Sequence, residues 1–114
     1  MKKSLFIIFL LIALHCHGIR VGSLEYNIYD YDRYGIGMAE VSAVNTAISG
    51  DITIPGGIST NGVQFNVTRI AKNGFEECRS LTSITLPPTI TSIENRAFYN
   101  CRSLDKISFD MNHE

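Results

Sequence analysis

Few side chains in this 114-residue sequence are suited to nucleophilic or metal chemistry. The histidines are His15, His17 and His113, and the cysteines are Cys16, Cys78 and Cys101. Hydrolase triads, thiol–imidazole pairs and zinc sites all require a histidine or several sulfur ligands close together. Because the two later cysteines have no histidine near them in the sequence, we expect no enzyme activity, no bound metal and no cofactor.

Two acidic residues alternate with tyrosines in the run Tyr29-Asp30-Tyr31-Asp32. On a strand both carboxylates would face one side, which suits calcium binding or a paired-acid mechanism. The same alternation is typical of a half-buried edge strand. We favour the edge strand.

The sequence Asn66-Val67-Thr68 is a glycosylation sequon. It makes Asn66 a modification site if the source organism has the transferase and the strand is exposed.

The first 18 residues predict a signal peptide rather than part of the fold. Lys2 and Lys3 precede an unbroken apolar run over 5–14, which is too short for a membrane-spanning helix of about 20 residues. We place the cleavage after Gly18. A lipid-modified Cys16 is the alternative, but His15 stands where a lipobox has a small residue.

Removal of this leader leaves eight basic and eleven acidic residues, a net charge of −3. The basic residues are scattered, so the sequence predicts no nucleic-acid partner. It also predicts no membrane span, and a secreted or cell-surface location.

An internal repeat organises the rest of the chain. Residues recur at a spacing of 23, and the pairs are Ile70 and Ile93, Phe75 and Phe98, Cys78 and Cys101, Leu81 and Leu104, and Ile84 and Ile107. A third copy lies upstream, where 52–55 matches 84–87 and 67–70 matches 90–93, with nine extra residues of turn-like composition between them. This period is typical of leucine-rich repeats.

Each copy indicates a strand, a turn, a second short strand and a short helix. Ile84 and Leu86 share one side of the first strand, and Pro87 and Pro88 end it. We expect the second strand over 90–93 and the helix over 94–101. No single copy buries its own apolar side, so the copies must stack.

The run from Ile93 to Ile107, together with its 23-residue equivalent, resembles the BspA-like class of leucine-rich repeats. The resemblance covers about residues 51–109, with Gly74 where the family prefers alanine. The segment 24–49 resembles the strand-rich lead-in that precedes such repeats. The resemblance implies a surface or secreted protein of bacteria or parasitic protists, with adhesion or host-protein binding in some members, and no catalytic residues.

The expected fold is therefore an α+β repeat solenoid, a right-handed leucine-rich-repeat stack of short strands and short helices. We divide the chain into a signal peptide over 1–18, a strand-rich lead-in over 19–50, repeats over 51–109 and a tail over 110–114.

Stacking of the repeats would place Cys78 beside Cys101. A disulfide is conceivable in an oxidising compartment, but side chains that point inward in parallel rarely reach its dihedral angle. We therefore favour buried free thiols.

The outward residues of the stacked first strands form the predicted binding face for a protein or glycan. They are Asp51, Thr53, Ser83, Thr85, Lys106 and Ser108.

The last copy has no cap, so we expect Leu104, Ile107 and Phe109 on an exposed edge that invites self-association. The alternative to a binding module is accordingly a structural subunit, or a truncated remnant of a longer surface protein.

Overall fold

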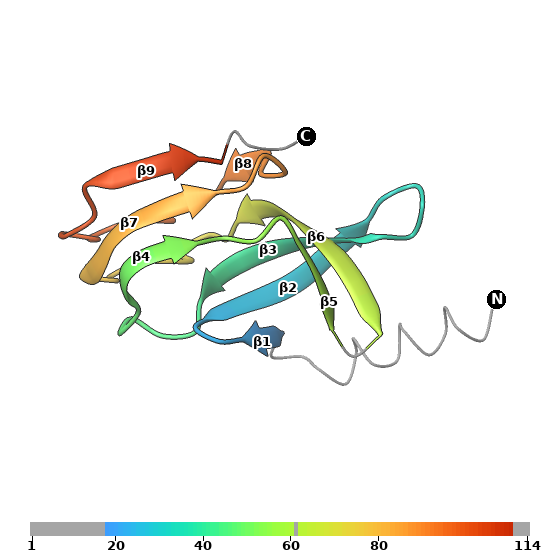
Figure 1. Ribbon diagram of the computed structural model, residues 1–114, viewed down its shortest axis with the longest axis horizontal. Helices are drawn as coiled ribbons and strands as arrows, with labels where there is room; N and C mark the ends of the chain where they lie inside the picture. Colours follow the sequence, from blue (N-terminus) through green and yellow to red (C-terminus); the bar gives the residue numbers. More distant parts are fainter. Residues whose placement is uncertain (1–17, 61, 111–114) are drawn as a thin grey trace.

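The computed structural model describes residues 18–60 and 62–110. Their secondary structure consists of strands and turns in two sheets (Figure 1). The strands are β1 (Ile19–Val21), β2 (Leu24–Tyr31), β3 (Gly37–Ala43), β4 (Ser49–Thr53), β5 (Gly57–Thr60), β6 (Val63–Ile70), β7 (Ser80–Leu86), β8 (Ser92–Ile93) and β9 (Lys106–Phe109). Residues 1–17 of the predicted signal peptide, with Cys16, and residues 111–114 of the predicted tail, with His113, lie outside the described residues.

Sheet A has the order β1-β2-β3-β6-β5, and β8 also pairs with β6. Sheet B has the order β4-β7-β9, and all of its strands are parallel. The chain passes three times from sheet A to sheet B, which defines three layers. Layer 1 contains β3 and β4, layer 2 contains β6 and β7, and layer 3 contains β8 and β9 (Figure 1).

The strand registers confirm the repeat. Ile52 pairs with Ile84, and Ile84 pairs with Ile107. In sheet A, Ile70 pairs with Ile93. The extra residues of the upstream copy form β5, which folds back antiparallel on β6, with Gly62 in a left-handed conformation at the turn (φ 77°). The lead-in is itself part of the stack, because its strand β3 runs parallel to β6 with Val41 opposite Ile70.

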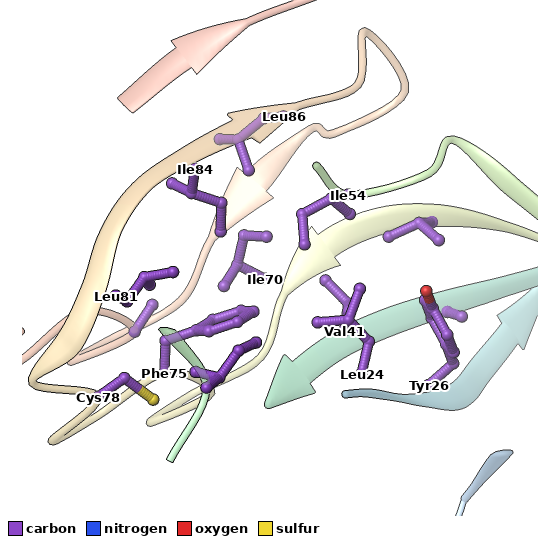
Figure 2. Close-up of a cluster of buried hydrophobic side chains, with 14 of the residues drawn as sticks. Leu24, Tyr26, Val41, Ile54, Ile70, Phe75, Cys78, Leu81, Ile84 and Leu86 are labelled. Atoms are coloured by element: carbon purple, nitrogen blue, oxygen red, sulfur yellow. The ribbon is translucent and has the colours of Figure 1, made fainter. Parts of the chain in front are cut away.

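The core lies between the two sheets (Figure 2). The alternate residues Ile84 and Leu86 of β7 point into it, as does Leu81 three residues earlier, and all three are fully buried near Ile70 and Phe75. Equivalent aromatic rings stack between layers, since Phe75 and Phe98 lie 5.5 Å apart at an interplanar angle of 19°. The core is thus continuous from one layer to the next, as expected for a solenoid.

The predicted helix over 94–101 is wrong. The segment is a series of three-residue turns, in which the N–H of Ala97 donates to Glu94 O at 3.2 Å and that of Cys101 donates to Phe98 O at 3.3 Å. Arg96 and Asn100 have φ angles of 58° and 60°, which no α-helix accommodates. The α part of the expected α+β class is therefore absent from the described residues.

The same series of turns joins β6 to β7 one layer earlier, where Asn73 and Glu77 have φ angles of 59° and 65°. The left-handed residues turn every second N–H out of the segment and towards layer 3. We call these three groups the layer 2 donors. They are the N–H groups of Asn73, Phe75 and Glu77, and they donate to the carbonyls of Asn95, Ala97 and Tyr99 at 3.1, 2.7 and 2.8 Å.

The helix prediction failed because an α-helix and a series of three-residue turns both bring residues three and four apart to one side. Ala97 is buried, and Phe98 and Cys101 pack against the core, so the expected inward positions are right. Their spacing cannot distinguish a helix from successive turns. Inter-layer hydrogen bonds offset the cost of the left-handed conformations, which is about 1 kcal/mol or more for Glu77 and Arg96.

Gly74 replaces the family's alanine for a steric reason. A Cβ atom there would lie 2.9 Å from Ala71 O and 3.2 Å from Val41 O, both backbone atoms. The Gly74 carbonyl also accepts the N–H of Ala43 at 3.0 Å. A side chain at this position would thus crowd both the backbone of its own turn and that of layer 1.

We therefore expect Gly74→Ala to lower the free energy of unfolding by about 1–3 kcal/mol, the usual cost of overpacking. Gly56→Ala is the matched control, because its nearest neighbours are side-chain atoms of Thr89 and Pro87 at 3.3 and 3.4 Å. Urea unfolding of both variants measures the difference. Equal stability of Gly74→Ala and the parent chain would contradict the close approach.

Candidate functional site

The parallel pairing of sheet B brings all six predicted face residues together in two rows. Asp51 pairs with Ser83, and Ser83 pairs with Lys106. Thr53, Thr85 and Ser108 form the second row in the same way. Asp51, Thr53 and Lys106 are exposed, and the other three are half-buried. We call this set the sheet B outer face.

Asp51 supplies the carboxylate of the sheet B outer face, and it accepts two side-chain hydrogen bonds. A register shift after Gly50 places Thr82 as well as Ser83 beside it. The Ser83 hydroxyl donates to Asp51 Oδ1 at 2.7 Å, and the Thr82 hydroxyl donates to the same atom at 3.2 Å. These hydrogen bonds, with a smaller contribution from the Lys106 charge, lower the pKa of Asp51 below its usual value. The face therefore keeps a negative charge at its β4 end.

Hydroxyl groups fill the space between the charged ends. Thr85 and Ser108 share a hydrogen bond of 3.3 Å between their side-chain oxygens. Lys106 supplies a positive charge at the β9 end of the first row. The face therefore offers an acid, several hydroxyls and an ammonium group in a fixed order. Such groups can hydrogen-bond a peptide backbone or the hydroxyls of a glycan.

Asn66, the predicted glycosylation site, lies on a different sheet. It is half-buried in β6, where it pairs with Met38 on one side and Gly57 on the other. The sequon hydroxyl, Thr68 Oγ1, lies 2.7 Å from the Tyr29 hydroxyl and donates to Ala39 O at 3.5 Å. A glycan on Asn66 would therefore leave from sheet A and not from the sheet B outer face.

A cluster around Tyr29 on sheet A is not indicated by any pattern in the sequence. The Arg69 guanidinium lies 3.6 Å from the centre of the Tyr29 ring, and Arg69 Nε donates to Glu40 Oε1 at 2.9 Å. These contacts join β2, β3 and β6 across the outer side of the sheet. Tyr29 reaches this side because the β2–β3 register shifts between Ile28 and Asp30.

Asp30 and Asp32 do not form a paired-acid site. Asp32 lies beyond the end of β2, and its Oδ1 accepts the N–H groups of Tyr34 and Ile36 at 2.8 and 3.0 Å. Asp30 accepts the N–H of Tyr31 at 2.8 Å. Asp32 therefore closes the turn that connects β2 to β3. Within 18–60 and 62–110, no group of three or more His, Cys, Asp or Glu side chains is arranged to hold a metal ion.

Cys78 is a buried free thiol, as expected, whereas Cys101 is a free thiol that is only half-buried against the core. Burial raises the pKa of Cys78 to about 11, and the nearby Cys101 adds to this effect. Cys101 Sγ donates to Phe75 O at 2.9 Å, and burial raises its pKa as well. Both sulfurs therefore belong to the apolar core.

Residues 52–114 match the model of the BspA-type leucine-rich repeat region, which comprises six copies. The chain therefore belongs to the BspA-type leucine-rich repeat family. No curated protein matches the chain significantly. In the part of the chain that the structure describes, no helix is long and apolar enough to cross a membrane.

Several solved structures are similar. A leucine-rich cell surface protein from Faecalibacterium prausnitzii has a TM-score of 0.63 and 25% identity over 83% of this chain and 24% of that one. A leucine-rich repeat protein from Bacteroides ovatus has a TM-score of 0.63 and 27% identity over 78% of this chain and 22% of its own. One from Bacteroides capillosus has a TM-score of 0.61 and 26% identity over 82% of this chain and 66% of its own. The chain thus spans about a quarter of the length of the first two.

The raised pKa of Cys78 predicts a pH dependence of stability. An unfolded cysteine loses its proton near pH 8.5, whereas the folded Cys78 keeps it until about pH 11. The unfolded state therefore binds fewer protons in this window, and the free energy of unfolding falls as the pH rises from about 8.5 to 11.

Urea unfolding at pH 8 and pH 10.5 checks this expectation. The Cys78→Ala variant is the control. Its loss of packing is the same at both pH values, and it has no thiol at this position to titrate. We expect a smaller fall in stability between the two pH values for the variant than for the parent chain. Equal falls would show that Cys78 does not contribute.

Proposed function

We propose that the chain is a secreted or cell-surface binding module that recognises a protein or glycan ligand through the sheet B outer face. The observation that carries the proposal is the register of Asp51, Ser83 and Lys106, which places an acid, a hydroxyl and an ammonium group across three adjacent strands. Membership of the family and the description of the Faecalibacterium prausnitzii relative as a cell surface protein support the location. A signal peptide over 1–18 is part of this proposal.

The order of charges gives the ligand a preferred direction. The low pKa of Asp51 keeps its carboxylate charged at mildly acidic pH. A positive or hydroxyl-rich group is expected over β4, and a negative one over Lys106 on β9. Glycosylation of Asn66, where it occurs, would leave this face open, because Asn66 lies in sheet A.

A structural role is the second candidate. Its support is the open end of layer 3, where Ile107 and Phe109 are 46% and 54% exposed. Leu104, also expected on this edge, packs against the core instead. In this role the chain would be a subunit of an assembly, which it could form by self-association through β9. It would then bind no separate ligand at sheet B.

The test begins with a glycan array and an array of extracellular proteins, followed by affinity measurements on each hit. The charge-swapped double variant Asp51→Lys with Lys106→Glu is expected to lose at least about tenfold in affinity, equivalent to about 1.4 kcal/mol. Its net charge is unchanged.

The matched control is the swap Arg20→Glu with Glu25→Arg, which reverses an ion pair of 2.9 Å between β1 and β2. It should leave the affinity as it is. If a ligand binds the Asp51/Lys106 double variant with the affinity of the parent chain, the sheet B outer face is ruled out as its binding site. An equal loss of affinity in the control variant would rule it out as well. Arrays without a hit, with concentration-dependent association of the chain, would favour the structural role.

A further inference from the structure

Sheet A is wider than sheet B on the side of the lead-in. Beyond layer 1, sheet A continues with β2 and β1, whereas sheet B stops at β4 (Figure 1). At the usual spacing between strands, the two extra strands extend about 10 Å past β4. The inner side of β1 and β2 and the free edge of β4 therefore form a step, which we call the β4 step.

The floor of the β4 step is apolar. Ile19 and Val21 of β1 pair with Tyr26 and Leu24 of β2, so all four side chains lie on the inner side of sheet A. Tyr26 and Leu24 are buried, but Val21 is 44% exposed and Ile19 is only partly buried. The outer side of the same strands is polar and carries the ion pair of Arg20. The apolar side of the overhang thus faces a position that no described strand of sheet B occupies.

The wall of the β4 step is an unpaired strand edge. The N–H of Ile54, just after β4, donates to Thr85 O at 2.9 Å. Because neighbouring residues of a strand direct their backbone groups to opposite edges, the N–H and C=O groups of Asp51 and Thr53 point away from β7. No described residue pairs with this edge of β4. The edge therefore offers both donors and acceptors to an added strand.

A carboxylate marks the outer rim of the β4 step. Asp51 is exposed, and the hydroxyls of Thr82 and Ser83 both donate to its Oδ1 atom. Among the described side chains none donates to Oδ2, which leaves this atom for a new neighbour. Opposite charges on adjacent strands stabilise their pairing. The step therefore favours a strand with apolar residues on its inner side and a basic residue beside Asp51.

The overhang of sheet A restricts what can reach the edge of β4. A folded domain that paired through one of its own sheets would have a second layer about 10 Å behind that sheet, where β1 and β2 already lie. A second copy of this chain would meet the obstacle twice, because each copy carries the overhang. Antiparallel pairing of two β4 edges would also bring two Asp51 carboxylates onto one face. A single extended segment meets neither obstacle.

We propose that the β4 step binds an extended segment of another protein, which adds to sheet B as a strand beside β4 and covers Ile19 and Val21. Apolar residues of the segment face β1 and β2, and they alternate with polar residues, of which a basic one lies beside Asp51. Main-chain hydrogen bonds to β4 supply affinity, and the alternate side chains supply selectivity. The site is a backbone edge with an apolar floor, whereas the sheet B outer face is a row of side chains, so either proposal can fail alone.

The test uses the full chain and a set of capped peptides of about six residues, the usual length of a strand. In these peptides valine, isoleucine or leucine alternates with lysine or threonine. Amide hydrogen exchange of Asp51 and Thr53, measured by NMR, should slow by about tenfold or more when a peptide is saturating. Glutamate in place of lysine should weaken the peptide by about twofold to fivefold. No slowing with any peptide of the set at up to about 1 mM would overturn the proposal.

Backbone methylation tests whether the peptide binds as a strand. Two versions of the tightest peptide carry N-methyl groups on alternate residues, one version on the apolar positions and the other on the polar positions. In a strand each version blocks the amides of one edge. Only one version should therefore lose at least about tenfold in affinity. Equal affinities of the two versions would contradict pairing with β4.

Variants of the protein locate the peptide. Val21→Asp places a charge on the floor of the step and should weaken the peptide by at least about tenfold. Unchanged protection of the Phe75 amide shows that this variant is folded. Tyr34→Asp is the matched control, because Tyr34 is 80% exposed in the β2–β3 turn. Lys106→Glu, which alters the sheet B outer face, should not weaken the peptide either. Normal binding to Val21→Asp, or loss of binding with one of the other two variants, would overturn the proposed location.

Exchange in the chain alone separates the possible occupants of the step. Without peptide, the amides of Asp51 and Thr53 should exchange rapidly at every protein concentration. Protection that is present at all concentrations would show that another part of this chain covers the edge. Protection that grows with concentration would show that a second copy does. Either result would overturn the proposal.

Discussion

The hydrogen bonds from the turn of one layer to the next are the constraint on which this structure depends. In most sheet proteins the backbone ladder ends where the strands end, but here it continues through the turns by the N–H groups of Asn73, Phe75 and Glu77. Each turn must then have the same length and the same left-handed residues as its neighbour. A 23-residue spacing between layers 2 and 3 follows, and with it the stacking of Phe75 on Phe98 and the burial of Cys78 beside Cys101.

This constraint explains which parts of the fold the sequence could predict. Equal spacing of identical residues predicts equal registers, so the pairing of Ile84 with Ile107 and the alignment of the outward residues of β7 and β9 follow directly. The alignment of β4 with β7 follows from the match of residues 52–55 with 84–87. Layer 1 is harder to recognise, because Val41 precedes its partner Ile70 by 29 residues and its turn is shorter. The turns themselves have the spacing of a helix, and nothing in Glu77 or Arg96 as residue types indicates a left-handed conformation. The contact of Tyr29 with Thr68 and Arg69 depends on a strand irregularity, which local sequence does not reveal.

Stacking also explains why side chains of different chemistry become neighbours. Asp51 lies next to two hydroxyl donors because a register shift brings Thr82 and Ser83 of β7 beside it. Lys106 follows on the next strand because the period places it there. An ordered row of polar groups is thus a direct product of the repeat, as is the open apolar end of layer 3. The family supports a surface protein, and its longer relatives show the same fold over part of their length.

Scalar coupling across hydrogen bonds tests the inter-layer ladder most directly. NMR of isotope-labelled protein detects a coupling between an amide nitrogen and the carbonyl carbon that accepts its hydrogen. The structure predicts a coupling from the Phe75 nitrogen to the Ala97 carbonyl, where the donor–acceptor distance is 2.7 Å. A coupling from the Cys101 nitrogen to the Ala97 carbonyl in its place would indicate a helical turn in layer 3 and would contradict the ladder.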